Sequence, residues 1–152
     1  MLSKLKELFA LPEPDSEQLE RRRQLAAAAL LIELGKADYR SDAREQAAIA
    51  QAIRDSFQLD EATVADLLAD AASASNRSTS LYEFTSVLNE SWSDAEKYQL
   101  IRQLWRVAAA DGNIDKYEDH LIRKVAELLY VPHQQFIHAK LEVLGGSDML
   151  DG

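Results

Sequence analysis

The sequence repeats one acidic stretch, and this repeat limits the folds that the chain can adopt. Residues 37–45 (Ala-Asp-Tyr-Arg-Ser-Asp-Ala-Arg-Glu) return 73 positions later as residues 110–118 (Ala-Asp-Gly-Asn-Ile-Asp-Lys-Tyr-Glu), and both copies keep Ala-Asp-x3-Asp-x2-Glu. Hydrophobic positions match at the same offset, among them Leu31 with Leu104, Leu34 with Val107, Ile49 with Ile122 and Phe57 with Tyr130. The repeat is too long for a solenoid unit and occurs only twice. It predicts one helical half-domain, duplicated and packed against its copy.

Charge and composition exclude several classes of protein. The chain has 152 residues, a formal net charge of −9 and no cysteine. A nucleic-acid binder would need a basic face, so none is expected as a partner. Without cysteine there can be no disulfide, thiolate metal site or thiol redox chemistry. No apolar run approaches the 18 residues of a membrane-spanning helix. The absence of cysteine is compatible with a reducing cytoplasm, and no stable membrane insertion is expected.

Hydrophobic periodicity predicts an all-α fold, a compact bundle of seven to eight helices with an internal pseudo-two-fold repeat. The helical domain is expected at 15–145, with its halves at about 15–74 and 80–145. The polar residues 75–80 should form the joint between them. Residues 146–152 are expected to be a frayed tail.

A short N-terminal helix is predicted at 1–12, ahead of the breaks at Pro12 and Pro14. It would carry an apolar stripe beside two lysines, Lys4 and Lys6. The stripe consists of Leu2, Leu5, Leu8 and Phe9. So short a helix more often packs on its own domain than on a membrane.

Local signals place the ends of several helices. Asp15-x-x-Gln18 and Ser93-x-x-Glu96 are spaced as capping boxes. Asp60 is expected to open a helix. The alanine run at 26–29 favours a close helix–helix contact, since small side chains let two backbones approach.

The acidic hairpin at 110–118 has a structural interpretation. Gly112 can adopt the left-handed conformation that closes a helix. Asp115 can cap the next helix, and Glu118 can reach back as its box partner. These roles require no ligand.

Asp111 and its counterpart Asp38 are not explained by capping. Each would lie in the last turn of a helix, facing the negative end of the helix dipole. A hard cation held by Asp111, Asn113, Asp115 and Glu118 would offset this. A basic neighbour would do the same, and Lys36, Arg40, Arg106 and Arg123 are available. The spacing is not that of an EF-hand, whose loop has about twelve positions.

Residues 104–129 closely resemble the tellurite-resistance protein B (TerB-like) family, and Leu81-Tyr-Glu-Phe-Thr85 and Phe57-Gln-Leu59 are similar to its small proteobacterial members. The resemblance covers about residues 20–142. It implies a cytoplasmic all-helical domain with internal pseudo-symmetry and an acidic site for a divalent cation such as Ca²⁺. That metal site would comprise Asp38, Asp42 and Glu45 with Asp111, Asp115 and Glu118. The first hairpin departs from the family pattern, because Tyr39 stands where the family has glycine.

These observations predict a non-enzymatic domain, one that binds a divalent cation, a protein partner or both, linked to a tellurite-type stress response. Ca²⁺ or another divalent cation is the only cofactor expected. One alternative is a purely structural or interaction module without metal. The other is a carboxylate-based metal-dependent enzyme, which His120, His133 and His138 support poorly because they form no paired motif on one helix face.

Overall fold

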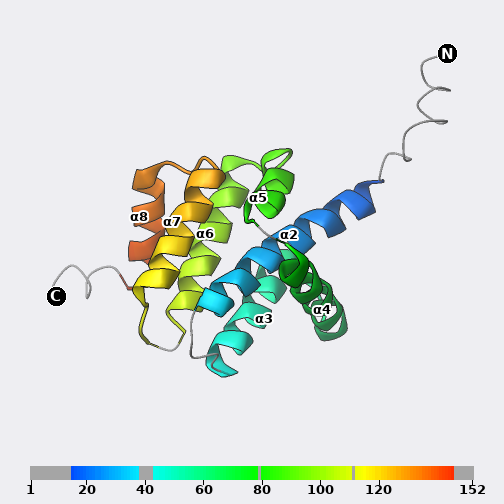
Figure 1. Ribbon diagram of the computed structural model, residues 1–152, viewed down its shortest axis with the longest axis horizontal. Coiled ribbons are helices and arrows are strands. Elements are labelled where there is room, and N and C mark those ends of the chain that lie inside the picture. The colour runs from blue at the N-terminus through cyan, green and yellow to red at the C-terminus, as the bar shows by residue number, and fades with distance from the viewer. Residues whose placement is uncertain (1–14, 38–42, 79, 111, 146–152) are drawn as a thin grey trace, which may run out of the picture.

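The computed structural model describes residues 15–37, 43–78, 80–110 and 112–145. These residues form seven α-helices and no strand, which confirms the predicted all-α fold (Figure 1). The helices are α2 (Ser16–Ala37), α3 (Ala43–Phe57), α4 (Glu61–Arg77), α5 (Tyr82–Asn89), α6 (Asp94–Ala108), α7 (Lys116–Leu128) and α8 (His133–Val143). The helix predicted at 1–12 and the frayed tail at 146–152 lie outside the described residues.

Side-chain caps fix where α2 and α6 begin, as predicted. At α2, Asp15 Oδ1 accepts the Gln18 N–H at 2.8 Å, and Gln18 Oε1 accepts the Asp15 N–H at 3.2 Å. Ser93 and Glu96 form the same reciprocal pair at α6. Each box satisfies two backbone N–H groups that have no partner within the helix.

The core is centred on α2, which packs against α3, α4, α5, α6 and α7. In Figure 1, α2 crosses the molecule obliquely beside the group formed by α6, α7 and α8. The alanines at 26–29 are at most 3% exposed, so the predicted close contact falls in the centre of the protein. Trp105 is fully buried and packs on Phe136 with ring centroids 5.2 Å apart.

The two halves pack their helices in the same order. α2 contacts α3 and α4, and α6 contacts α7 and α8. α2 and α6 also contact each other. In addition, α2 contacts α7 and α6 contacts α3. The repeat-related residues Leu31, Leu104, Leu34 and Val107 are all buried. A two-fold relation between the halves stays a prediction, which these contacts favour.

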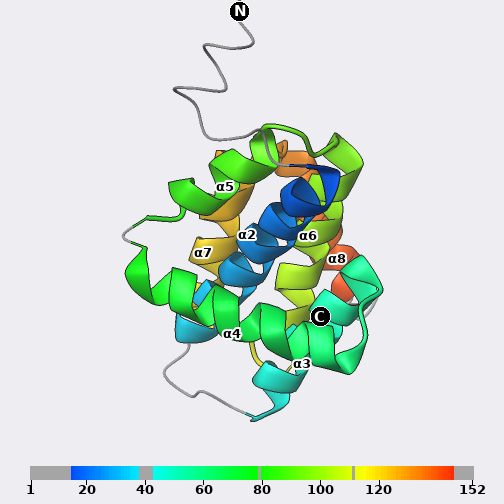
Figure 2. The same ribbon diagram turned by 90° about the vertical axis from the view of Figure 1, so that its right-hand side faces the viewer.

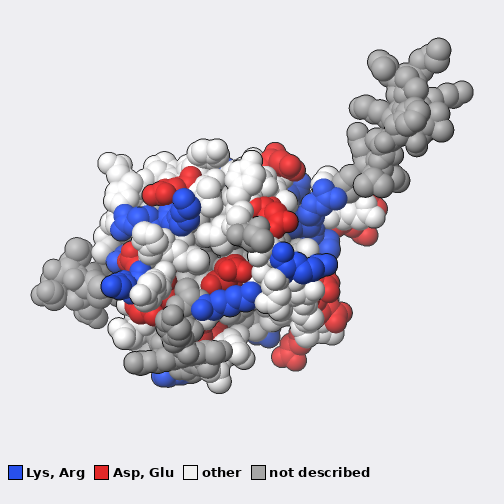
Figure 3. All heavy atoms as spheres, in the orientation of Figure 1, with Lys and Arg blue, Asp and Glu red and all other residues white. Residues whose placement is uncertain are grey.

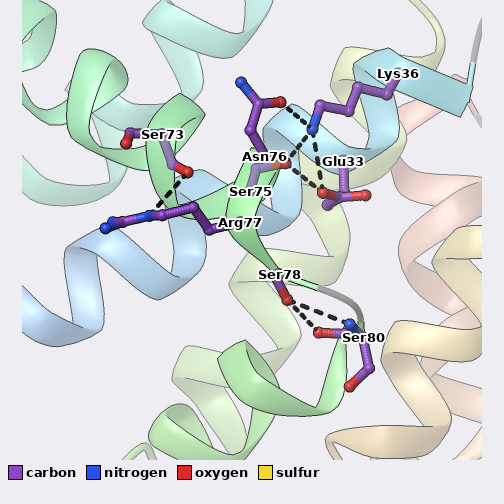
Figure 4. A network of polar contacts seen from close by, with 8 residues as sticks. All are labelled: Glu33, Lys36, Ser73, Ser75, Asn76, Arg77, Ser78 and Ser80. Atoms are coloured by element: carbon purple, nitrogen blue, oxygen red, sulfur yellow. Dashed lines mark hydrogen bonds and ion pairs between the residues drawn. The ribbon is translucent and has the colours of Figure 1, made fainter.

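Residues 75–80 were predicted to form a joint outside the helices, and this prediction is wrong for residues 75–77. α4 continues through Arg77, and Ser75 is only 3% exposed. Figure 4 shows the reason: Lys36 Nζ of α2 donates to Ser75 Oγ at 2.6 Å and to Asn76 Oδ1 at 2.9 Å. The Ser75 hydroxyl in turn donates to Glu33 of α2. The polar side chains that suggested a loop are matched by polar partners on α2, so the helix extends.

Candidate functional site

The helix ends that flank the two acidic stretches of the repeat lie at the same end of the molecule. α2 and α6 end there, and α3 and α7 begin there, in the lower part of Figures 1 and 2. Of the six predicted metal-site residues, the structure describes Glu45, Asp115 and Glu118. Asp38, Asp42 and Asp111 lie outside the described residues, and so does Tyr39.

The turn between α6 and α7 has the backbone that the sequence predicts. Gly112 has a φ of +86°, in the left-handed region, and its N–H donates to the Ala109 carbonyl at 2.9 Å. A Cβ at Gly112 would meet no atom within 4 Å. Glycine is therefore favoured here by the backbone conformation, and not by a lack of space.

Asp115 is the N-cap of α7. Its Oδ1 accepts the N–H groups of Tyr117 at 2.8 Å and Glu118 at 3.0 Å. Glu118 Oε1 accepts the Asp115 N–H at 3.3 Å, which completes a capping box. The structural roles predicted for Asp115 and Glu118 are thus confirmed.

Glu118 differs from an ordinary capping-box glutamate in its burial. Glu118 is only 1% exposed, whereas Glu96, at the same position of the box that starts α6, is exposed. Glu45 is the third residue of α3, as Glu118 is of α7, and it is only 3% exposed. Both glutamates of the repeat are therefore withdrawn from water at the start of a helix, where the dipole favours negative charge.

Two of the basic side chains considered as partners for the acidic stretches are bonded elsewhere. Lys36 is bonded to Ser75, Asn76 and Glu33 (Figure 4). Arg123 Nη2 lies 3.6 Å from Asp119 Oδ1, and its guanidinium stands 5.0 Å from the centroid of the Phe136 ring.

Sequence reasoning missed an ion pair next to the turn. Lys140 Nζ of α8 lies 3.0 Å from Asp119 Oδ2 of α7, and it also stands 5.0 Å from the centroid of the Trp105 ring. Asp119 and Lys140 line an open hollow of about 650 Å³, together with Gly112, Asn113 and the end of α8. Asp119 follows the repeated motif directly, but Lys140 is 21 positions away and only the packing of α8 brings it there.

The described part of the chain contains no group of three or more histidine, aspartate or glutamate side chains placed to hold a metal ion. Over the face drawn in Figure 3, lysine and arginine alternate with aspartate and glutamate, without a continuous basic patch. Among the helices described, none has the length and apolar character needed to cross a membrane.

A comparison with family models identifies the chain. The model described as "Tellurite resistance protein TerB" matches residues 24–141, which run from α2 into α8 and include both acidic stretches. Comparisons with curated proteins and with solved structures gave no match. Because the matched region covers most of the chain, the protein belongs to the TerB family of tellurite resistance proteins.

Proposed function

We propose that this TerB-family domain is a non-enzymatic module that binds a divalent cation such as Ca²⁺. The ion would bind at the acidic corners, by which we mean the turn between α6 and α7 and the turn between α2 and α3. At the α6–α7 corner the ligands would be Asp111, Asp115 and Glu118. At the α2–α3 corner they would be Asp38, Asp42 and Glu45. Carboxylate oxygens are the ligands that Ca²⁺ prefers in proteins. With no cysteine in the chain, a role in tellurite resistance would act through the bound ion and a protein partner, and not through thiol chemistry.

The burial of Glu118 carries the proposal. Burying a carboxylate costs on the order of several kcal/mol in lost hydration, unless neighbouring charges and hydrogen bonds compensate for it. Capping alone does not require this burial, since Glu96 caps α6 while exposed. The same burial at Glu45 places a second carboxylate in the corresponding position of α3. We infer that a cation shared with the neighbouring aspartates adds to the interactions that these two glutamates already make.

The Asp119–Lys140 pair bears on where the ion would bind. Lys140 already neutralises Asp119 in the open hollow, so this carboxylate would be a poor ligand for a cation there. We therefore propose that the ion binds at the turn itself, with Asp115 and Glu118 among its ligands.

A protein-interaction module without metal is the second candidate, and the hydrogen bonds of Asp115 favour it. Asp115 Oδ1 already accepts two backbone N–H groups, so this carboxylate has a structural role without any ion. Tyr117, the second residue of α7, is 58% exposed beside the same turn and would contribute to a protein contact. Aromatic side chains of this kind are enriched at protein interfaces.

Thermal unfolding at increasing Ca²⁺ or Mg²⁺ concentration separates the two candidates. A bound ion should stabilise the wild-type protein by about 2.7 kcal/mol when its concentration is 100 times Kd. Glu118→Gln should abolish this increment, because glutamine can complete a capping box but supplies no charge. Glu96→Gln is the matched control, an exposed residue at the same position of another box, and it should keep the increment. A midpoint that is independent of both ions in the wild type would leave the metal-free module as the function.

Asp111 and Asp115 should respond differently in the same assay. Asp111→Asn is expected to weaken ion binding while leaving the fold intact. Asp115→Ala should also cost about 1 kcal/mol in the ion-free protein, because it removes an N-cap. Equal destabilisation by both substitutions, with no dependence on the ion, would contradict a ligand role for Asp111.

A further inference from the structure

A groove lies away from the acidic corners, where the end of α3 and the beginning of α6 flank α2. Its volume is about 370 Å³, within the range of about 300–1,000 Å³ that is usual for binding pockets. Ala27, Leu31, Ile53 and Leu100 form its floor and are themselves buried. Phe57 and Trp92 also line it and are only half-buried. Figure 2 shows α2, α3 and α6, the three helices that contribute most of the residues lining the groove.

The rim of this groove is acidic. Glu20, Asp55 and Glu96 line it, and no lysine or arginine does. Glu20 is paired with Arg23 at 3.2 Å. The hydrogen bonds of the other two carboxylates come from neutral donors: Asp55 accepts the Gln51 amide at 2.7 Å, and Glu96 accepts the Ser93 N–H. Asp55 and Glu96 therefore hold net negative charge beside an apolar floor.

The chain carries a segment of complementary chemistry directly before α2. Residues 2–9 combine apolar side chains at helical spacing with Lys4 and Lys6, against a single Glu7. Residues 10–14 lie between Phe9 and Asp15, and the chain from one Cα to the other can span about 20 Å when extended. α2 rises about 18 Å from Asp15 to Ala27. Phe9 can therefore reach the level of Ala27 if the chain turns back along α2, and Pro12 and Pro14 favour an extended connection.

We propose that residues 2–9 dock in this groove of the same molecule, with apolar side chains between Phe57 and Trp92 and with lysines facing Asp55 and Glu96. Tethering makes the contact intramolecular, at an effective concentration of about millimolar for a short linker. A weak contact is thus sufficient to keep the groove covered. The groove acts as a docking site for an apolar segment that bears lysine.

Paramagnetic broadening in the full-length chain tests this contact. The protein has no cysteine, so Ser3→Cys gives a single site for a nitroxide label. It has two tryptophans, and their indole N–H signals report the groove (Trp92) and the buried core (Trp105) in one spectrum. The label should broaden the Trp92 signal strongly and the Trp105 signal much less. Asp55→Lys should largely relieve the broadening, and Lys4→Glu with Lys6→Glu should restore it in that variant. Asp66→Lys, which changes an exposed carboxylate outside the groove, should have no effect.

Three outcomes would overturn the proposal. The Trp92 signal could be broadened no more than by free nitroxide. Broadening of comparable strength could appear when labelled chains without ¹⁵N are mixed with unlabelled ¹⁵N chains, which would make a second copy the occupant. Broadening could also be absent while the labelled chain sediments with vesicles of phosphatidylglycerol and phosphatidylcholine, which would make the segment a membrane contact.

Discussion

Among the residues that the structure describes, two other than glycine hold the left-handed conformation, and they lie at the ends of corresponding helices. Gln58 follows α3 with a φ of 55°, and Tyr130 follows α7 with a φ of 60°. At α7 the turn is closed by two bonds, Tyr130 N–H to Glu127 and Val131 N–H to Ala126. This is the Schellman arrangement, in which glycine is the usual residue. The backbone of the fold, and not a preference of tyrosine, sets this conformation.

Tyr130→Gly should therefore stabilise the protein by about 0.5–1 kcal/mol. The left-handed backbone costs a side-chain-bearing residue about 1–2 kcal/mol, and the greater freedom of glycine when unfolded returns about 0.5–1 kcal/mol. Little packing is lost, because Tyr130 is 79% exposed. Urea unfolding at equilibrium measures the difference. A loss of stability would show that the tyrosine ring makes contacts worth more than the strain.

Gly112→Ala is the matched substitution of opposite sign. Gly112 has the same kind of backbone, and a Cβ there has open space around it. The variant should thus lose about 0.5–1 kcal/mol, because strain of about 1–2 kcal/mol is partly offset by about 0.5–1 kcal/mol from the smaller freedom of unfolded alanine. If its stability is unchanged, the turn relaxes to a conformation that alanine accepts.

At the residue scale, sequence could predict the role of Gly112 and Asp115 but not the burial of Glu118. A capping box specifies hydrogen bonds between neighbours in the chain, which spacing reveals. Burial depends on what other helices place over the side chain, and Glu96 and Glu118 have the same local signal with opposite exposure. The Asp119–Lys140 pair escaped prediction for the same reason.

At the scale of the helix, caps and ends follow from local chemistry unless a neighbouring helix adds partners. Asp60 opens α4 as predicted, with Oδ1 accepting the Thr63 N–H at 2.8 Å. The other end of α4 was predicted three residues too early, because Lys36 and Glu33 of α2 stabilise Ser75 within the helix. Local sequence therefore predicts where α4 begins, while a tertiary contact determines where it ends.

The cap of α4 should make stability depend on pH. The hydrogen bonds with Thr63 hold the pKa of Asp60 below its usual value of 3.8. A lowered folded-state pKa contributes stability that is present above pH 3.8 and is lost as the pH falls through the folded value. Asp60→Asn keeps a good N-cap but removes the titrating group. The wild type should therefore be the more stable protein at pH 7, and its advantage should shrink by pH 3 in urea unfolding.

A constant difference between wild type and Asp60→Asn at both pH values would show that charge does not act at this cap. Asp66→Asn, on the same helix and without a cap bond, is the control and should show less pH dependence.

At the scale of the whole molecule, hydrophobic periodicity predicted the helical class but not the central position of α2. Apolar periodicity identifies which face of a helix is buried, but not which helices cover it. α2 contacts helices of both halves, and its residues from Ala26 to Leu31 are each at most 3% exposed. Burial on all sides of α2 makes one core out of the two halves.

The second half should accordingly fail to fold alone. A fragment of residues 80–145 retains α5 to α8 but loses α2 and α3, which cover the inner faces of α6 and α7. Leu104 and Ile122 have no exposed surface in the whole chain, and leaving each apolar side chain in water forfeits about 1.5–3 kcal/mol. Since an entire domain is stable by only about 5–15 kcal/mol, a few such losses exceed what the fragment can retain. Circular dichroism should show partial helix with no cooperative thermal transition, and mixing with a fragment of residues 1–79 should restore the transition. A cooperative transition in the isolated fragment would mean that each half is an independent folding unit and that α2 only joins them.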